Sequence, residues 1–276
     1  MRRAARSPLL SLLACGLATW LGCTSAPPRQ AGVAPVAVYP TAEALPANHL
    51  KFYLLFPEPM REGIFLEHCR LLDSRGREVP EPFRETELWS TDGRRLTLWL
   101  HPGRQKTGVN LNVEIGPVLR EGGQYTLVIS GKWPTARGAP LGNDSVKTFA
   151  TTEPDRTQPS LDRWQLLLPR ARFRDPLLVR FDEPLDWALL HNKLRIEQAD
   201  GSTVRGDIKV GRGERTWTFT PEEPWRVGDY RLAAEGVLED LAGNSLLRPF
   251  EVDLSRPARE AAPAPSRFHI PFSVAP

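Results

Sequence analysis

The side chains that could carry acid, base or metal chemistry are scattered along this chain of 276 residues. None of its five histidines stands in a His-x-x-Glu-His pattern, and no two cysteines have the short spacing that zinc sites use. The Gly-x-Ser-x-Gly elbow of a serine hydrolase is missing from the sequence too. The sequence therefore predicts a protein that is not an enzyme and holds no metal or cofactor.

Adjacent carboxylates form two notable pairs, Asp182-Glu183 and Glu222-Glu223, each beside a proline. A glycosidase needs two acids that face each other across a cleft. Neighbours on a strand point to opposite faces, so we expect both pairs to lie solvated at strand ends. Asp240 and Asn244 carry oxygens of the kind that calcium accepts, but the expected role of Asp240 is to cap the amides of a tight turn.

Recognition of a ligand has its best candidates in Trp99, His101, Arg104 and Lys106. Trp99 falls on the face of a predicted strand opposite the apolar side chains. His101 lies just before a polar segment, 103–117, and Arg104 and Lys106 lie at its start. Together they would offer an aromatic surface and N–H donors to an anionic group or a sugar. The alternative is a solvated hairpin, with Trp99 covered by a neighbouring strand or by the C-terminal tail.

The segments that must position these residues have the pattern of β-strands. Apolar and polar residues alternate with period two over 96–100, 125–129 and 216–220. Asp200-Gly201 falls between two such runs, and this dipeptide tolerates the positive φ of a two-residue hairpin turn. Long amphipathic helical periods are absent from the sequence, so the body is predicted to be all-β. One short segment, 185–194, fits either a helical turn or a strand.

An internal repeat divides this body in two. Landmarks of residues 56–149 recur in the same order at 181–250, displaced by roughly 100–125 residues, which is the length of a domain. The matches are Phe56-Pro57-Glu58-Pro59-Met60 with Phe181-Asp182-Glu183-Pro184-Leu185, Leu98 and Leu100 with Trp217 and Phe219, Tyr125 with Tyr230, Gly138 with Gly243, and Phe149 with Phe250. Segment 103–117 is an insertion in the first copy, and such extra loops on a repeated scaffold often carry binding sites.

The second copy resembles a known family in four successive landmarks. They are Val179-Arg180-Phe181-Asp182-Glu183-Pro184-Leu185, Trp217-Thr218-Phe219-Thr220-Pro221, Gly228-Asp229-Tyr230-Arg231-Leu232 and Asp240-Leu241-Ala242-Gly243-Asn244-Ser245-Leu246. In this order they are similar to the bacterial immunoglobulin-like (Ig-like) domain of the S-layer SbsA type, well over 160–254 and less well over 48–152. The resemblance implies two tandem Ig-like β-sandwiches used as a spacer, adhesion or interaction module, and it implies no reaction.

The first residues of the chain predict export and lipid attachment. Three arginines precede an apolar stretch, 9–22, which is short for a membrane-spanning helix and typical of a signal peptide. Trp20-Leu21-Gly22-Cys23 then resembles a bacterial lipobox, although leucine is usual where Trp20 stands. Cleavage before Cys15 would leave too short an apolar core. The resemblance implies acylation of Cys23 and, since no Asp follows it, an anchor in the outer membrane that faces the periplasm or the cell surface.

The predicted division of the chain follows from these patterns. It comprises a lipoprotein signal peptide at 1–22, a flexible Pro/Ala-rich tether at 23–48, a first Ig-like domain at 49–153, a second at 154–254, and a linker with a possible terminal strand at 255–276. The apolar tail 267–274 is expected to return to a sheet edge, with capture of a partner strand as the alternative. Cys69, the one cysteine of the body, is expected to be a buried, inert thiol.

The charge of the chain excludes nucleic acid as a partner. The sequence holds 36 basic and 33 acidic residues, and a signal peptide at 1–22 would remove three arginines, which leaves a formally neutral body. A nucleic-acid-binding protein should show a basic excess or patch.

The predicted function is a non-catalytic envelope lipoprotein, bound to the membrane by its anchor, that meets an envelope protein or cell-wall glycan as a spacer or interaction module. The alternatives are a glycan- or peptide-binding lipoprotein that uses segment 103–117 and, third, a hydrolase.

Overall fold

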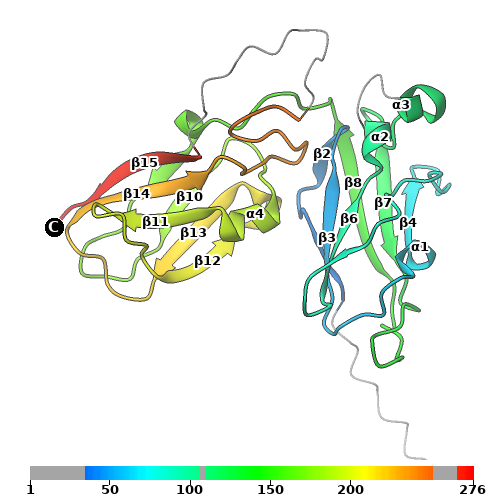
Figure 1. Ribbon diagram of the computed structural model, residues 1–276, viewed down its shortest axis with the longest axis horizontal. Helices are drawn as coiled ribbons and strands as arrows, with labels where there is room; N and C mark the ends of the chain where they lie inside the picture. Colours follow the sequence, from blue (N-terminus) through cyan, green and yellow to red (C-terminus); the bar gives the residue numbers. More distant parts are fainter. Residues whose placement is uncertain (1–34, 106–109, 251–265) are drawn as a thin grey trace, which may run out of the picture. The chain divides into compact units, whose positions relative to one another are not determined.

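The computed structural model describes residues 35–105, 110–250 and 266–276. They form two β-sandwiches, which we call lobe 1 (35–153) and lobe 2 (154–250 with 266–276) (Figure 1). The predictions for the signal peptide, for the Cys23 anchor and for Lys106 fall outside the described residues. Within the described ranges, no helix is both long and apolar enough to cross a membrane.

Lobe 1 is built from two four-stranded sheets. The first has the order β1 (Ala37–Tyr39), β3 (Lys51–Leu55), β6 (Arg95–Trp99) and β5 (Leu88–Trp89), and the second has the order β2 (Ala44–Pro46), β8 (Ser145–Thr152), β7 (Gln124–Ile129) and β4 (Cys69–Asp73). Strands β2 and β8 run parallel, and the other neighbours run antiparallel. Short helices α1 (Phe65–His68), α2 (Pro102–Gln105) and α3 (Asn110–Ile115) lie in the connections.

Lobe 2 repeats the plan with a four-stranded and a three-stranded sheet. The first has the order β9 (Gln165–Leu167), β10 (Leu177–Arg180), β13 (Thr216–Pro221) and β12 (Gly206–Val210), and the second has the order β11 (Leu194–Gln198), β14 (Gly228–Glu235) and β15 (Arg267–Val274). The ambiguous segment 185–194 forms helix α4 (Trp187–Asn192) before it enters β11. Two 3₁₀ turns, η1 (Leu161–Arg163) and η2 (Arg212–Glu214), complete the lobe.

The strand order identifies both sandwiches as Ig-like. In chain order, lobe 2 places its first, second, fifth and fourth strands in one sheet and its third, sixth and seventh in the other, which is the strand order of the constant-type Ig fold. Lobe 1 follows the same order and adds β2 beside its last strand. Each lobe also has the tyrosine corner of this fold, because the hydroxyl of Tyr125 accepts from Arg120 N (2.9 Å) and that of Tyr230 donates to Arg226 O (3.1 Å). The predicted all-β fold with two tandem Ig-like sandwiches is confirmed.

The period-two pattern of the strands buries the core of each lobe. Every second residue of β6 and of β13 is buried, including Leu96 and Leu98 in lobe 1 and Trp217 and Phe219 in lobe 2. Full burial of one such side chain stabilises a fold by about 1.5–3 kcal/mol. The alternation predicted from the sequence therefore gives the correct inward face for both strands.

The register of the sheets corrects one match of the internal repeat. Leu98 lies opposite Phe52, and Phe219 lies opposite Leu177, the counterpart of Phe52 in the second copy. Leu98 therefore corresponds to Phe219 and not to Trp217, so the predicted match was two residues out of register. Because side chains alternate with a period of two, this error left the inward face right.

The last strand of lobe 2 corrects a second match and one boundary. Phe149 of β8 lies opposite Tyr125, and Phe272 of β15 lies opposite Tyr230. The counterpart of Phe149 is thus Phe272 and not Phe250. The predicted second domain ended at 254, whereas the tail 267–274 supplies its seventh strand. The expected return of the tail to a sheet edge is confirmed.

The Pro/Ala-rich tether was predicted to extend too far. Residues 37–39 and 44–46 are strands of lobe 1, and Leu45, in the middle of the second of them, is fully buried. Pro46 is tolerated because β2 is an edge strand, where a missing N–H breaks no central ladder. Composition alone does not distinguish such an edge strand from a tether, since both are rich in proline and small residues.

Candidate functional site at the junction of the two lobes

The structure does not gather the predicted ligand-binding residues into one site. The side chain of Arg104 is only 3% exposed and donates to main-chain oxygens of Gly116 (2.9 Å), Pro117 (3.2 Å), Glu81 (3.1 Å) and Pro80. Its guanidinium therefore fastens the inserted segment to a neighbouring turn and is not available to a ligand. Sequence reasoning could not see this role, because the acceptors are backbone atoms.

The other candidate ligand residues of lobe 1 are partly covered. Trp99 is half-buried, and the ammonium of Lys51 lies 5.0 Å from its ring centroid, within reach of a cation–π contact. His101 is half-buried as well. Binding by Trp99 and His101 stays a prediction. Cys69 is buried, and burial raises the pKa of its thiol, so it has the inert character expected of it.

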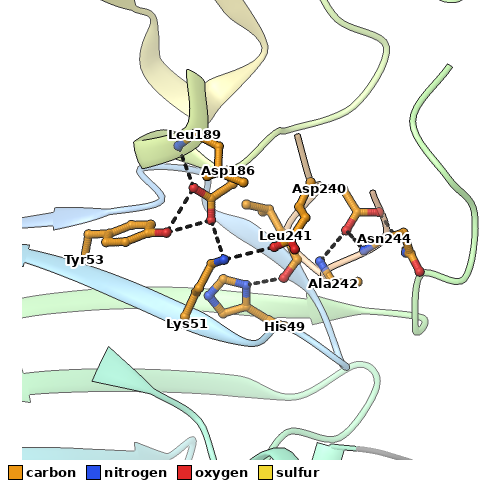
Figure 2. Close-up of polar contacts among 10 residues, drawn as sticks. His49, Lys51, Tyr53, Asp186, Leu189, Asp240, Leu241, Ala242 and Asn244 are labelled. Atoms are coloured by element: carbon orange, nitrogen blue, oxygen red, sulfur yellow. Dashed lines mark hydrogen bonds and ion pairs between the residues drawn. The ribbon is translucent and has the colours of Figure 1, made fainter. Parts of the chain in front are cut away.

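The most elaborate polar site in the described residues lies where the two lobes meet, around Asp186 (Figure 2). Asp186 of lobe 2 is 2% exposed and caps α4, because its carboxylate accepts from Leu189 N (2.9 Å). The same carboxylate accepts from the hydroxyl of Tyr53 (2.9 Å) and pairs with the ammonium of Lys51 (3.0 Å), both from β3 of lobe 1. Lys51 also contacts Glu239 of lobe 2 at 3.1 Å.

The charges of this cluster depend on one another. Burial alone would lower the pKa of Lys51, but the carboxylates of Asp186 and Glu239 outweigh it and hold the pKa above its ordinary value. Burial, followed by the nearby charge of Asp186, raises the pKa of Tyr53, so its hydroxyl stays protonated and donates. A buried ion pair adds little net stability, whereas removal of one partner leaves a costly unpaired charge. The cluster therefore favours one relative position of β3 and α4.

A second buried carboxylate joins the lobes at Glu214. This side chain of η2 is 0% exposed, and it accepts from Thr41 N (2.7 Å), the Thr41 hydroxyl (2.8 Å) and Ala42 N (3.2 Å) of lobe 1. Burial raises the pKa of Glu214, and the Thr41 donors partly offset that rise. In return Gly213 N donates to the Thr41 hydroxyl at 2.7 Å, so the contact is satisfied from both sides.

The Asp-x-Ala-Gly-Asn turn that marked the family resemblance forms the third contact. Asp240 caps it as expected, accepting from Ala242 N (2.7 Å) and Asn244 N (2.9 Å). Leu241 O accepts from Leu50 N (3.2 Å), and the Leu241 side chain packs in the core of lobe 1. Gly243 has a φ of +84°, and a Cβ there would collide with Leu50.

A buried histidine completes this contact. His49 Nδ1 lies 3.1 Å from Leu241 O. Burial, as the largest cause, lowers the pKa of His49 to about 3, so the ring is neutral and Nδ1 carries the proton that it donates. Close by, Trp187 of α4 stacks on Tyr39 of lobe 1 with ring centroids 4.3 Å apart. Polar and aromatic contacts thus bind the same pair of surfaces.

One acid predicted to be solvated faces this junction instead. Glu183 lies with Asp155 and Asp240 in a group whose carboxylate oxygens all fall within 4.8 Å of one another. Burial first, then the charges of Asp240 and Asp155, raise the pKa of Glu183 to about 8. Asp182 does remain exposed, in an ion pair with Arg163 at 3.1 Å. The expectation was thus right for Asp182 and wrong for Glu183, because both lie in a bend after β10 and the sequence does not reveal which groups Glu183 meets.

Replacement of Glu183 by glutamine should flatten the pH dependence of stability. The pKa of Glu183 is about 8 in the folded chain against 4.5 ordinarily, so its contribution is fully present below pH 4.5 and is lost as the pH rises through 8. Glutamine keeps the shape and carries no charge. At pH 8 we expect the variant to melt roughly 2–4 °C above wild type, the shift that about 1 kcal/mol gives in a chain of this size. At pH 4.5 the two proteins should melt at the same temperature. Thermal unfolding at both pH values measures this; an equal shift at both would contradict it.

Most of the residues at this junction carry no signal in the sequence. Lys51, Tyr53 and Thr41 read as ordinary outward positions, and their partners lie more than 130 residues away in the chain. The single usable sign was Asp186 before a short helix-like stretch, which is the pattern of an N-cap. Tertiary packing of the two lobes, and not local pattern, creates the site.

Comparison with known proteins adds only distant likenesses in fold. No protein-family profile and no curated protein sequence matches the chain. Among solved structures, domains 1–6 of the surface-layer protein SbsC share 12% identity at a TM-score of 0.30, over 73% of this chain and 23% of that one. Escherichia coli alpha-2-macroglobulin, domains MG0-NIE-MG1, shares 12% at 0.27 over 88% and 70%. A chimeric titin Z1Z2 shares 13% at 0.24 over 72% and 86%. The chain thus spans about a quarter of the SbsC fragment, and the fold assignment rests on strand order.

Proposed function

We propose that this chain is a non-catalytic arm of the bacterial envelope, in which two Ig-like lobes joined as one rigid body hold an interaction surface at a fixed distance from a membrane. The N-terminal sequence supports the anchor, through the lipobox-like Trp20-Leu21-Gly22-Cys23. Acyl chains on Cys23 would retain the protein at the outer membrane, since each buried CH₂ contributes about 0.8 kcal/mol. An envelope protein or a cell-wall glycan is the proposed partner.

The observation that carries the proposal is the buried polar junction between the lobes. Flexible tandem domains meet through small, solvated contacts, whereas Asp186 and Glu214 here are almost without solvent and satisfied by donors of the other lobe. Residues 33–276 accordingly form one compact unit. A body of this kind suits a spacer that holds an interaction surface in a fixed position.

The distance between the lobes in the membrane-bound protein tests the rigid arm. Spin labels on Ser74→Cys and Ser202→Cys, two exposed turn residues of different lobes, should give one narrow distance distribution, and buried Cys69 should escape labelling. A broad distribution would refute the rigid body.

Intact-protein mass spectrometry of the same membrane fraction tests the anchor. The mass should correspond to a chain that begins at Cys23 and carries acyl chains, and Cys23→Ser should lose those chains. An unacylated mass from wild type would refute the anchor.

A further inference from the structure

A groove of about 520 Å³ lies beside the junction, between the end of β3, the turn that joins β5 to β6, and α4. Leu55 and Phe56 contribute apolar surface, and Trp187 of α4 contributes an aromatic wall. Ser90 and Asp92 line the turn side, where they are hydrogen-bonded to each other and to the backbone of the turn. The groove is mainly apolar, with its polar groups on one side, as is usual for small-ligand sites.

Arg95 gives this groove its chemical character. It lies on the same face of the sheet as Lys51 and Tyr53, because residues two apart on paired strands share a face. Lys51 is paired with two carboxylates. In contrast, none of the described residues accepts a hydrogen bond from the half-buried guanidinium of Arg95, and its Nε is shielded from solvent without a partner. Such an orphaned donor is uncommon in folded proteins, where buried polar groups are generally hydrogen-bonded.

The neighbouring charged residues do not supply the acceptor that Arg95 lacks. Asp92 lines the same groove, but its carboxylate accepts from the Ser90 hydroxyl (2.5 Å) and Arg94 N (3.2 Å). Arg94 is exposed, and its guanidinium donates to Pro57 O (2.9 Å). Arg95 is thus the one guanidinium of the groove that the described residues leave without an acceptor. A positive group beside apolar walls is complementary to an anion that is carried on an apolar body.

We propose that this groove binds an apolar carboxylate, that is, a carboxylate with an aliphatic or aromatic group next to it. The proposed occupant is the C-terminus of a partner protein that ends in an apolar residue, because an envelope protein is a proposed partner of this module. A free carboxylic acid shares this chemistry and is distinguished from it by the test. The planar guanidinium of Arg95 would hold both carboxylate oxygens, while the apolar group fills the space between Phe56 and Trp187. The inference adds a ligand class to the proposed interaction module. It rests on the proposed function only in that the groove binds its ligand without catalysis.

Calorimetric titration of the full chain with paired probes tests this site. The probes are acetyl-Ala-Leu-Phe with a free carboxylate and as its amide, and 4-phenylbutyrate with 4-phenylbutanol as its neutral counterpart. We expect the carboxylates to bind about tenfold or more tightly than their neutral counterparts, as one well-placed charged contact allows. Arg95→Gln should abolish that difference, and the matched control Arg94→Gln should keep it.

The outcomes separate the source of the ligand from the failure of the proposal. Tighter binding of the peptide supports a protein C-terminus as the occupant, and tighter binding of phenylbutyrate overturns that occupant in favour of a free acid. Equal binding of charged and neutral probes, an unchanged preference in Arg95→Gln, or no binding in the millimolar range would overturn the site. Arg95→Gln should melt no lower than wild type, because it removes an unsatisfied donor. In Arg95→Gln the distance between the spin-labelled lobes should not change, so failure of the groove proposal is distinguishable from failure of the rigid arm.

Discussion

Replacement of Asp186 by alanine is expected to lower the free energy of unfolding by about 3–5 kcal/mol, the cost of breaking a buried ion pair from one side. Among the described residues, the change leaves the ammonium of Lys51 with Glu239 as its only carboxylate partner and the hydroxyl of Tyr53 without an acceptor. It also removes the cap of α4. Denaturant-induced unfolding, followed by a signal from each lobe, measures the loss.

Two companion variants make this result specific to the junction. Asp182→Ala breaks an exposed ion pair with Arg163, and it should cost less than about 1 kcal/mol. Lys51→Met combined with Asp186→Ala should recover part of the loss, because no unpaired ammonium then remains. A loss below about 1 kcal/mol for Asp186→Ala would mean that water reaches the cluster and that Asp186 does not hold the lobes together.

Removal of β15 should have the other large effect, the collapse of lobe 2. This strand pairs with β14 over its whole length and buries Phe272 and Val274 against the core. Truncation of a buried phenylalanine alone costs about 3–5 kcal/mol, and loss of the whole strand also exposes the edge of β14. A chain that stops after residue 266 should therefore lose hydrogen-exchange protection throughout lobe 2.

The controls for this truncation lie in β15 or directly after it. Removal of 275–276 alone, both exposed, should leave protection unchanged. Phe272→Ala should weaken lobe 2 while it still folds, and Ser273→Ala, at an exposed position of the same strand, should be close to neutral. Full protection of β14 in the chain that stops at 266 would show that β15 is dispensable to the sheet.

The fold could be predicted from the sequence because its information is local and repeated. Alternation over 96–100 and 216–220 gave the strands and their inward faces, and turn residues such as Gly138 and Gly243 gave two domains. The boundaries of the two domains were harder to predict. Pro46 and its neighbours resemble a tether in composition although Leu45 is fully buried, and a linker-like segment separates β15 from the rest of its lobe.

The candidate site could hardly be predicted at all, for a physical reason. Lys51, Arg95 and Arg104 cannot be told apart in the sequence, since none of the three lies in a motif that indicates its role. Lys51 is paired across the junction, and Arg95 is left without an acceptor among the described residues. Arg104 fastens a loop through backbone oxygens. Their roles depend on surfaces that meet only after both lobes have folded, and neither periodicity nor composition records such meetings.

The parallel pairing of β2 with β8 bears on how the protein responds to mechanical force. Parallel strands enter their sheet from the same edge, so tension between the chain before β2 and the chain after β8 pulls the two strands in opposite directions along their axes. The register from Ala44 opposite Ala150 to Pro46 opposite Thr152 is then loaded in shear, with its hydrogen bonds strained together. A hairpin pulled from its open end instead peels one bond at a time. The parallel pair therefore resists stretching between the chain before β2 and the chain after β8.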